Sequence, residues 1–154
     1  MKLKLFIYIL LTMVSTAVNA QSANLKVNQI FTGKVIPLER MVVTKVKGRA
    51  LSKYGLNYYR SARFVASRKE RYRCIDAVEQ DMRAMCSGST AQKRSERHTA
   101  IAFMLRPQGA SNRFITLVCN KEDDNQYGIT LIYMEETVKS LNELNKIINK
   151  KKKT

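Results

Sequence analysis

Three closely spaced apolar segments in the C-terminal half constrain the fold more than any other feature of the chain. Each is rich in β-branched and aromatic residues, which is typical of strands. The connections between them are short and polar and contain turn residues, so neighbouring segments are predicted to pair as antiparallel hairpins. The three predicted strands are TAIAFML (99–105), RFITLVC (113–119) and GITLIYM (128–134).

The first of these hairpins looks apolar on both of its faces. With the turn centred near Gly109, Ala100 is predicted to lie opposite Cys119. A sheet with one face open to water should alternate more cleanly between apolar and polar residues. The two strands are therefore either covered on both faces or meet a partner on one face, and we favour double coverage. In this register Ile101, Phe103 and Leu105 share one face, and Met104, Ile115 and Leu117 share the other.

The N-terminal half contains two further predicted strands. They are RMVVTKVKG (40–48) and NYYRSARFVAS (57–67), and a short helix is predicted before them over residues 24–31. The segment SGSTAQKRSER (87–97) has no large apolar residue. We therefore predict that it forms a mobile surface loop.

Two main helices are predicted from apolar residues at the three-and-four spacing of a buried stripe. The first runs from about Lys69 to Met85, and the second runs from about Glu135 to Lys150. Together with the strands they predict an α+β fold, an antiparallel sheet of about five strands with two main helices packed on it. The apolar stripes are Ile75, Val78, Met82 and Met85 in the first helix, and Val138, Leu141, Leu144 and Ile148 in the second.

The first twenty residues have the plan of a secretory signal peptide. Two lysines precede an almost unbroken apolar run over residues 5–14, and Val18 and Ala20 stand at the small-residue positions before a cut. The run is roughly ten residues long, whereas a membrane-spanning helix needs about 20. We predict cleavage after Ala20 and no transmembrane segment in the mature chain.

Cleavage after Ala20 of the 154-residue chain leaves 134 residues, which is the length of one domain. We predict a single α+β domain over residues 21–149 and a basic tail over 150–154. A lipid anchor would need a cysteine at the cut, and Gln21 stands there instead. The protein is therefore expected to be soluble and extracytoplasmic, either periplasmic or secreted.

The chain is strongly basic. It has 28 lysines and arginines against 12 acidic residues, a net charge of +16 that falls to +14 when the two lysines of the leader are removed. Such a charge attracts polyanions. Outside the cytoplasm these are lipopolysaccharide, acidic glycans, anionic phospholipids and extracellular DNA. The expected partners are a protein or an anionic component of the cell envelope.

Basic and aromatic residues alternate in LSKYGLNYYRSARFVASRKERYR (51–73). A nucleic-acid surface would need both kinds on one face, but a strand over 57–67 mixes them on each face. Arginine stems commonly lie over apolar surface with the charged head in water. We therefore favour a structural role over an anion-binding face, and nucleic-acid recognition is the least favoured interpretation. The anion-binding candidates are Arg60, Arg63, Arg68, Lys69, Arg71 and Arg73.

The same region carries a family resemblance. The sequence KG at 47–48, then Leu51, Tyr54 and Leu56, then YRS at 59–61, resembles a pattern in short secreted proteins of unknown function from Bacteroidota. The resemblance covers most of the mature chain in length and layout. It implies an extracytoplasmic compartment and a small α+β domain, and it implies no site or activity.

The three cysteines allow two states. Cys74 and Cys86 flank one predicted helix and would stand about 18 Å apart along its axis, too far for a disulfide. Cys119 can pair with Cys74 or with Cys86, or all three stay reduced and act as small buried hydrophobes. With no Cys-x-x-Cys pair and a single histidine, no metal site is predicted, and no cofactor is predicted either.

Two functions from different classes follow from these observations. The leading hypothesis is a non-catalytic binding module, because no catalytic constellation is evident. The alternative is a small extracytoplasmic hydrolase in which Cys119 is the nucleophile and His98 its base, since the predicted register places them diagonally on one face, about 7–8 Å apart. The acidic run Glu122–Asp124 lacks the spacing of a calcium loop and is predicted to be a solvated turn.

Overall fold

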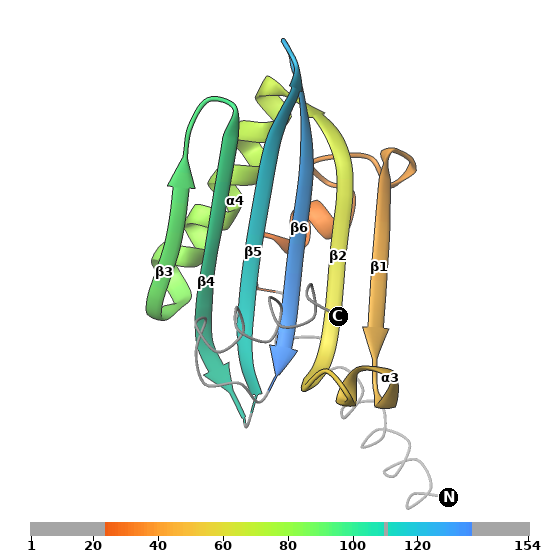
Figure 1. The fold of residues 1–154 in the computed structure, drawn as a ribbon, viewed down its shortest axis with the longest axis vertical. Helices are drawn as coiled ribbons and strands as arrows, with labels where there is room; N and C mark the ends of the chain where they lie inside the picture. Colours follow the sequence, from red (N-terminus) through yellow and green to blue (C-terminus); the bar gives the residue numbers. More distant parts are fainter. Residues whose placement is uncertain (1–23, 110, 137–154) are drawn as a thin grey trace, which may run out of the picture.

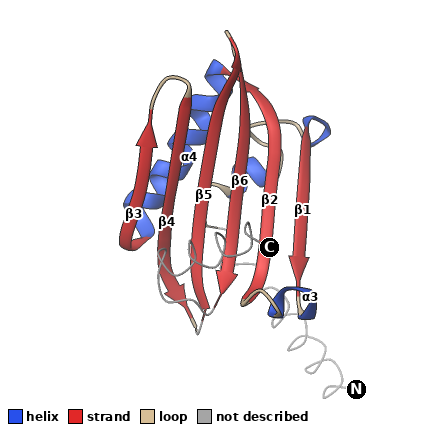
Figure 2. Cartoon of the chain, in the orientation of Figure 1, coloured by secondary structure: helices blue, strands red, loops and turns tan. Residues whose placement is uncertain are grey.

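The computed structural model describes residues 24–109 and 111–136, which form one antiparallel sheet of six strands with helices behind it (Figures 1 and 2). The strand order across the sheet is β1-β2-β6-β5-β4-β3. The strands are β1 (Met41–Lys47), β2 (Leu56–Ser67), β3 (Cys86–Arg94), β4 (His98–Gln108), β5 (Ser111–Asp123) and β6 (Gln126–Glu136). The helical elements are α2 (Asn28–Phe31), the 3₁₀ helix η1 (Leu38–Arg40), α3 (Arg49–Ser52) and α4 (Arg68–Met85).

The predicted sheet of about five strands with two main helices was wrong. The sheet has six strands, and α4 is the one helix of more than four residues within the described part of the chain. The second main helix was predicted to begin at Glu135, but β6 continues through Glu136. Residues 137–150 of that predicted helix lie outside the described residues. The architecture combines helix and sheet, and sheet predominates.

The additional strand is β3, which replaces the predicted mobile loop. It pairs with β4 along residues 90–94 at the edge of the sheet. Most of its side chains are exposed. Hydrophobic periodicity reports burial rather than backbone pairing, so a polar strand at a sheet edge leaves no such signal.

The register of the β4–β5 hairpin differs by one residue from the predicted register. Next to the turn, Gln108 pairs with Ser111, as a turn centred near Gly109 requires. Beyond it, Arg106 and Pro107 of β4 occupy the space opposite one residue of β5, which is a β-bulge. Proline has no N–H to donate to the ladder, which suits it to a bulge.

The bulge decides which side chains share a face. Thr99 rather than Ala100 lies opposite Cys119, and Ile101 pairs with Leu117. A one-residue shift moves every side chain of a strand to the other face. The apparent apolarity of both faces was therefore wrong. On one face Ile101, Phe103, Leu105, Ile115, Leu117 and Cys119 are all buried together.

The opposite face of the sheet is less apolar. Phe114 and Met134 are buried there in a smaller cluster, with Met104 and Ile132 partly buried against them. Further along the same face, residues such as Ala102, Thr116 and Val118 are only half-buried. The main core consequently lies on one side of the sheet.

Helix α4 and the segment around α2 cover the core face, behind the sheet in Figure 1. The segment is fastened to α4 by Asp81, whose carboxylate accepts hydrogen bonds from the backbone N–H groups of Lys26 (2.7 Å) and Val27 (2.9 Å). Asp81 is buried, and this burial raises the pKa of its carboxyl group. Its two backbone donors satisfy the carboxylate, which would be costly to bury without partners.

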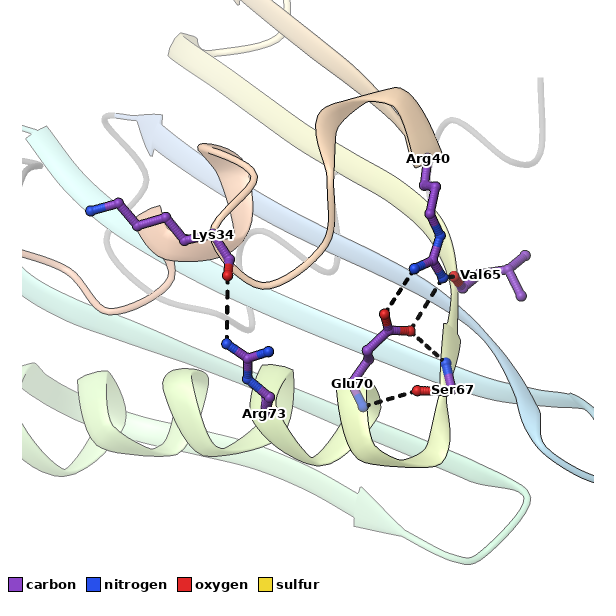
Figure 3. A network of polar contacts seen from close by, with 6 residues as sticks. All are labelled: Lys34, Arg40, Val65, Ser67, Glu70 and Arg73. Atoms are coloured by element: carbon purple, nitrogen blue, oxygen red, sulfur yellow. Dashed lines mark hydrogen bonds and ion pairs between the residues drawn. The ribbon is translucent and has the colours of Figure 1, made fainter.

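The start of α4 is fixed by a reciprocal capping arrangement (Figure 3). Ser67 accepts a hydrogen bond from the Glu70 N–H, and the Glu70 carboxylate accepts one from the Ser67 N–H. Arg40 donates hydrogen bonds to the same carboxylate from both terminal nitrogens, Nη1 at 2.8 Å and Nη2 at 3.2 Å. Its Nη2 also donates to the Val65 carbonyl. The network joins the end of η1, just before β1, to the end of β2 and the first turn of α4.

Replacing Glu70 by Gln should destabilise the protein at neutral pH by about 0.5–1 kcal/mol, because the charged contact with the exposed Arg40 is lost. Hydrogen bonding by Arg40 lowers the pKa of Glu70 from 4.5 to about 2. A carboxyl group whose pKa is lower in the folded than in the unfolded protein stabilises the fold at pH values above its unfolded-state pKa. This stabilisation is lost as the pH falls through the folded-state pKa. The difference between wild type and Glu70→Gln should therefore shrink between pH 4.5 and pH 2.

Urea unfolding at a series of pH values measures this difference. The matched control is Glu39→Gln, which removes the same charge from an exposed residue next to Arg40. Equal unfolding free energies for wild type and Glu70→Gln at pH 7 would contradict the assigned role of the network.

Candidate functional site

The basic residues highlighted by the sequence do not form one patch. Arg60 and Arg63 point to opposite faces of β2, since they are three residues apart on a strand. The other candidates, Arg68, Lys69, Arg71 and Arg73, lie in the first two turns of α4. The structure divides the set by environment and brings two of them, Arg68 and Arg71, into one pocket.

Two of the candidates make contacts that support the fold. The Arg60 guanidinium lies over the Phe31 ring, 4.4 Å from its centroid, with a long contact of 3.4 Å to the Phe31 carbonyl. Arg73 reaches the Lys34 carbonyl at 3.5 Å (Figure 3). Arg60 contacts the N-terminal segment from the sheet, and Arg73 contacts it from α4.

A different group of basic residues is exposed along β1 and α3. Residues 41–69 contain eight lysines and arginines and no Asp or Glu. We use the term basic edge for Lys45, Lys47, Arg49 and Lys53, which are exposed on β1, α3 and the turn that follows. In the described residues, none of the four lies within 4.0 Å of a carboxylate.

Exposed apolar and aromatic groups accompany the basic edge. Val42 is 67% exposed, and Val43 and Tyr54 are each 39% exposed. Lys53 Nζ lies 5.0 Å from the centre of the Tyr54 ring, within range of a cation–π contact. None of the four basic-edge residues is among the anion-binding candidates predicted from the sequence, which begin at Arg60. The signal that could have revealed them is the absence of acidic residues from 41 to 69.

A second basic site is a cavity of about 800 Å³ between α4 and the strands β3, β4 and β6, which we call the arginine pocket. Arg71 is buried in its wall, where its Nη2 donates to Thr99 Oγ1 at 2.9 Å. The Tyr127 ring lies 4.8 Å from the Arg71 guanidinium. A hydrogen bond with Tyr127 also raises the pKa of Arg68. The lining is Arg68, Arg71, Tyr72, Ile75, Asp76, Glu79, Arg94, Ser95, Glu96, Thr99 and Tyr127.

Cys119 and His98 are not brought together. Cys119 pairs with Thr99 on the buried face, whereas His98 pairs with Asn120 on the other face. The His98 Nδ1 instead contacts Asn120 Oδ1 at 2.5 Å. The predicted diagonal placement was wrong because of the bulge in β4. This geometry gives the hydrolase alternative no support.

All three cysteines are free thiols in the structure. Cys74 and Cys119 are buried in the same core, and Cys86 is half-buried where α4 ends. Burial raises the pKa of Cys74 to about 12, and the nearby Cys119 adds to this shift. Burial likewise raises the pKa of Cys119 to about 11, and the charge of Arg71 opposes the shift. A disulfide involving Cys119 stays a prediction.

The acidic run predicted as a solvated turn lies at the end of β5 and in the turn before β6. Its side chains are exposed, and Asp124 approaches Lys121 at 4.0 Å. Across the described ranges, no three His, Cys, Asp or Glu residues gather where they could hold a metal ion. Over the same ranges, no helix is both long enough and apolar enough to cross a membrane.

Comparison with known protein families identifies a match over most of the chain. The model of a family of unknown function (DUF6108) matches residues 13–148, which is most of the chain. No curated protein and no solved structure matches the chain. The match agrees with the expectation of a domain of unknown function, while the bacterial group suggested by the resemblance stays a prediction.

In the reduced, folded protein we expect a thiol reagent to modify Cys86 and to leave Cys74 and Cys119 unmodified. The two core thiols are inaccessible and, with their raised pKa values, protonated at neutral pH. Alkylation followed by mass spectrometry should find one modified cysteine in native protein and three in urea. The variant Cys86→Ser serves as the control and should show none in the native state. Modification of Cys119 as fast as Cys86 would instead indicate an activated thiol.

Proposed function

The chain belongs to this family of unknown function (DUF6108), and we propose that it is an extracytoplasmic binding module whose basic edge attaches to an anionic membrane surface of the cell envelope. The observation that carries the proposal is the unneutralised charge of Lys45, Lys47, Arg49 and Lys53 along one exposed border of the sheet. Lysines two residues apart on a strand stand about 7 Å apart. Several such charges therefore act within one Debye length of each other, about 8 Å at physiological salt.

The side chains around the basic edge also suit a membrane surface. Tyr54 combines an apolar ring with a polar hydroxyl, the type of side chain that favours the boundary between water and lipid. Val43 adds exposed apolar surface on the same face of β1 as Lys45 and Lys47. Anionic headgroups attract basic residues by about 1 kcal/mol each near the surface. Together these groups favour shallow attachment to a membrane surface.

Lysines on an edge strand have a second effect, because they hinder pairing with the edge of another sheet. This effect alone would explain Lys45 and Lys47 on β1. It does not account for Arg49 and Lys53, which lie on or just after α3 rather than on a strand. Binding to vesicles separates the two explanations, because protection of the edge predicts no membrane association.

The extracytoplasmic location is supported by the leader-like sequence of residues 1–20 and by the basic charge of the remaining chain. We expect the mass of the intact secreted protein to begin at Gln21. A mass that still includes Met1 would contradict the proposed location, and the anionic partner would then have to be sought inside the cell.

The triple variant Lys45→Gln, Lys47→Gln, Lys53→Gln should bind anionic phospholipid vesicles about a hundredfold more weakly than wild type, at about 1 kcal/mol per lysine. Wild-type binding should also weaken as salt is raised, because the contact is electrostatic. Co-sedimentation with phosphatidylglycerol-containing vesicles measures the binding. Vesicles of phosphatidylcholine alone should bind little protein.

The matched control is Lys93→Gln, Arg97→Gln, Arg106→Gln, which removes the same charge from exposed residues of β3, β4 and the loop between them. This variant should bind much more strongly than the basic-edge variant. An equal loss of vesicle affinity in both triple variants would show that binding depends on net charge and not on the basic edge. If the wild-type protein does not bind anionic vesicles even at low salt, the membrane proposal is rejected.

A further inference from the structure

The arginine pocket contains a buried positive charge that the protein does not neutralise. Arg71 is 8% exposed, and none of the carboxylates in the described residues lies within 4.0 Å of its guanidinium. We propose that the arginine pocket binds a small organic acid, whose carboxylate pairs with Arg71 and whose apolar or aromatic body occupies the rest of the cavity.

Arg71 has N–H donors that no described protein group uses. Its Nη2 is used by Thr99 Oγ1, and its Nε is buried with no hydrogen-bond partner among the described residues. The Tyr127 ring at 4.8 Å offsets part of the cost of burying the charge. A buried charge without a full set of partners is costly to the fold. A carboxylate in the pocket would supply the missing charge and accept from Nη1, which makes no hydrogen bond within the described residues, whereas the fully buried Nε lies out of its reach.

The other charged residues of the lining already have partners. Glu79 forms ion pairs with Arg94 and Arg83, and Glu96 pairs with Lys121. Asp76 accepts a hydrogen bond of 2.6 Å from Gln80. Arg68 has no ion pair in the described part of the chain and lies beside Tyr127, close to Arg71. Gln80 is neutral, so the charges of the lining without an ion pair are Arg68 and Arg71 against Asp76, and their sum is positive.

The size and lining of the pocket favour an organic monoanion over a small inorganic ion. Its volume of about 800 Å³ falls in the range of about 300–1,000 Å³ that holds small organic ligands. The rings of Tyr72 and Tyr127 and the side chain of Ile75 supply apolar lining. Because Asp76, Glu79 and Glu96 stand in the same wall, a dianion such as phosphate would be repelled more strongly than a monocarboxylate.

This inference does not depend on the proposed membrane function. The pocket is built from α4 and from strands β3, β4 and β6, whereas the basic edge belongs to β1 and α3. The probes are small molecules in solution without vesicles. A failure of one proposal therefore leaves the other intact.

Titration of the full secreted protein with sodium benzoate, followed by amide NMR shifts at constant ionic strength, tests the proposal. We expect saturable shifts in the first turns of α4 and around residues 94–99. Benzamide, which has the same ring without the charge, should cause no saturable shift, and phosphate should bind more weakly than benzoate. The variant Arg71→Met, which keeps the length of the side chain and removes its charge, should bind benzoate at least tenfold more weakly.

Lys69→Gln is the control, because Lys69 is a neighbouring exposed cation on α4 that does not line the pocket. It should bind benzoate as wild type does. Equal binding by Arg71→Met, saturable shifts only outside the pocket, or tighter binding of phosphate than of benzoate would each overturn the proposal. If Arg71→Met does not fold, the location of the wild-type shifts and the benzamide comparison still decide the outcome.

Discussion

The arrangement of the whole molecule depends on one extra residue in β4. The bulge at Arg106 and Pro107 places the apolar side chains of β4 and β5 on the same face of the sheet. That face then needs a cover, which α4 and the segment around α2 supply. Without the bulge, the apolar residues of the hairpin would be divided between two faces, and neither helical segment would meet a continuous apolar surface. The one-sided core is the consequence of this local irregularity.

The position of α4 on the core face also determines what its first turns can do. The contact of Glu70 with Ser67 and Arg40 fixes where the helix begins. Arg71 lies one residue further, at the point where α4 passes over Tyr127 and Thr99. The same network that stabilises the helix start therefore holds a buried guanidinium beside a cavity. The structural contact of Glu70 and the proposed binding role of Arg71 therefore belong to adjacent residues of one turn.

Much of the fold could be predicted from periodicity, because that signal reports which residues are buried. The sequence pattern located α4 and five of the six strands, but not β3, whose polar side chains lie at an exposed edge. It also could not give the register of β4 and β5, since the bulge depends on Pro107 and on backbone pairing. For the site, sequence identified Arg68 and Arg71 as anion-binding candidates. It could not identify Arg94, Thr99 and Tyr127 as their neighbours, because those come from three different strands.

The charge of the protein is separated in space, so the two proposed anion-binding regions would act independently. No acidic residue occurs from 41 to 69, whereas the acidic residues nearest the pocket are on α4 and in the turn before β4. The lysines of β1 lie far from the pocket along the strands, because Lys45 is level with Arg60 of β2 whereas Tyr127 is level with Ala66, six residues or about 20 Å away. This exceeds the Debye length of about 8 Å at physiological salt, so the lysines on β1 contribute little to the potential in the arginine pocket. Attachment through the basic edge would thus leave both the affinity of the pocket and access to it largely unchanged.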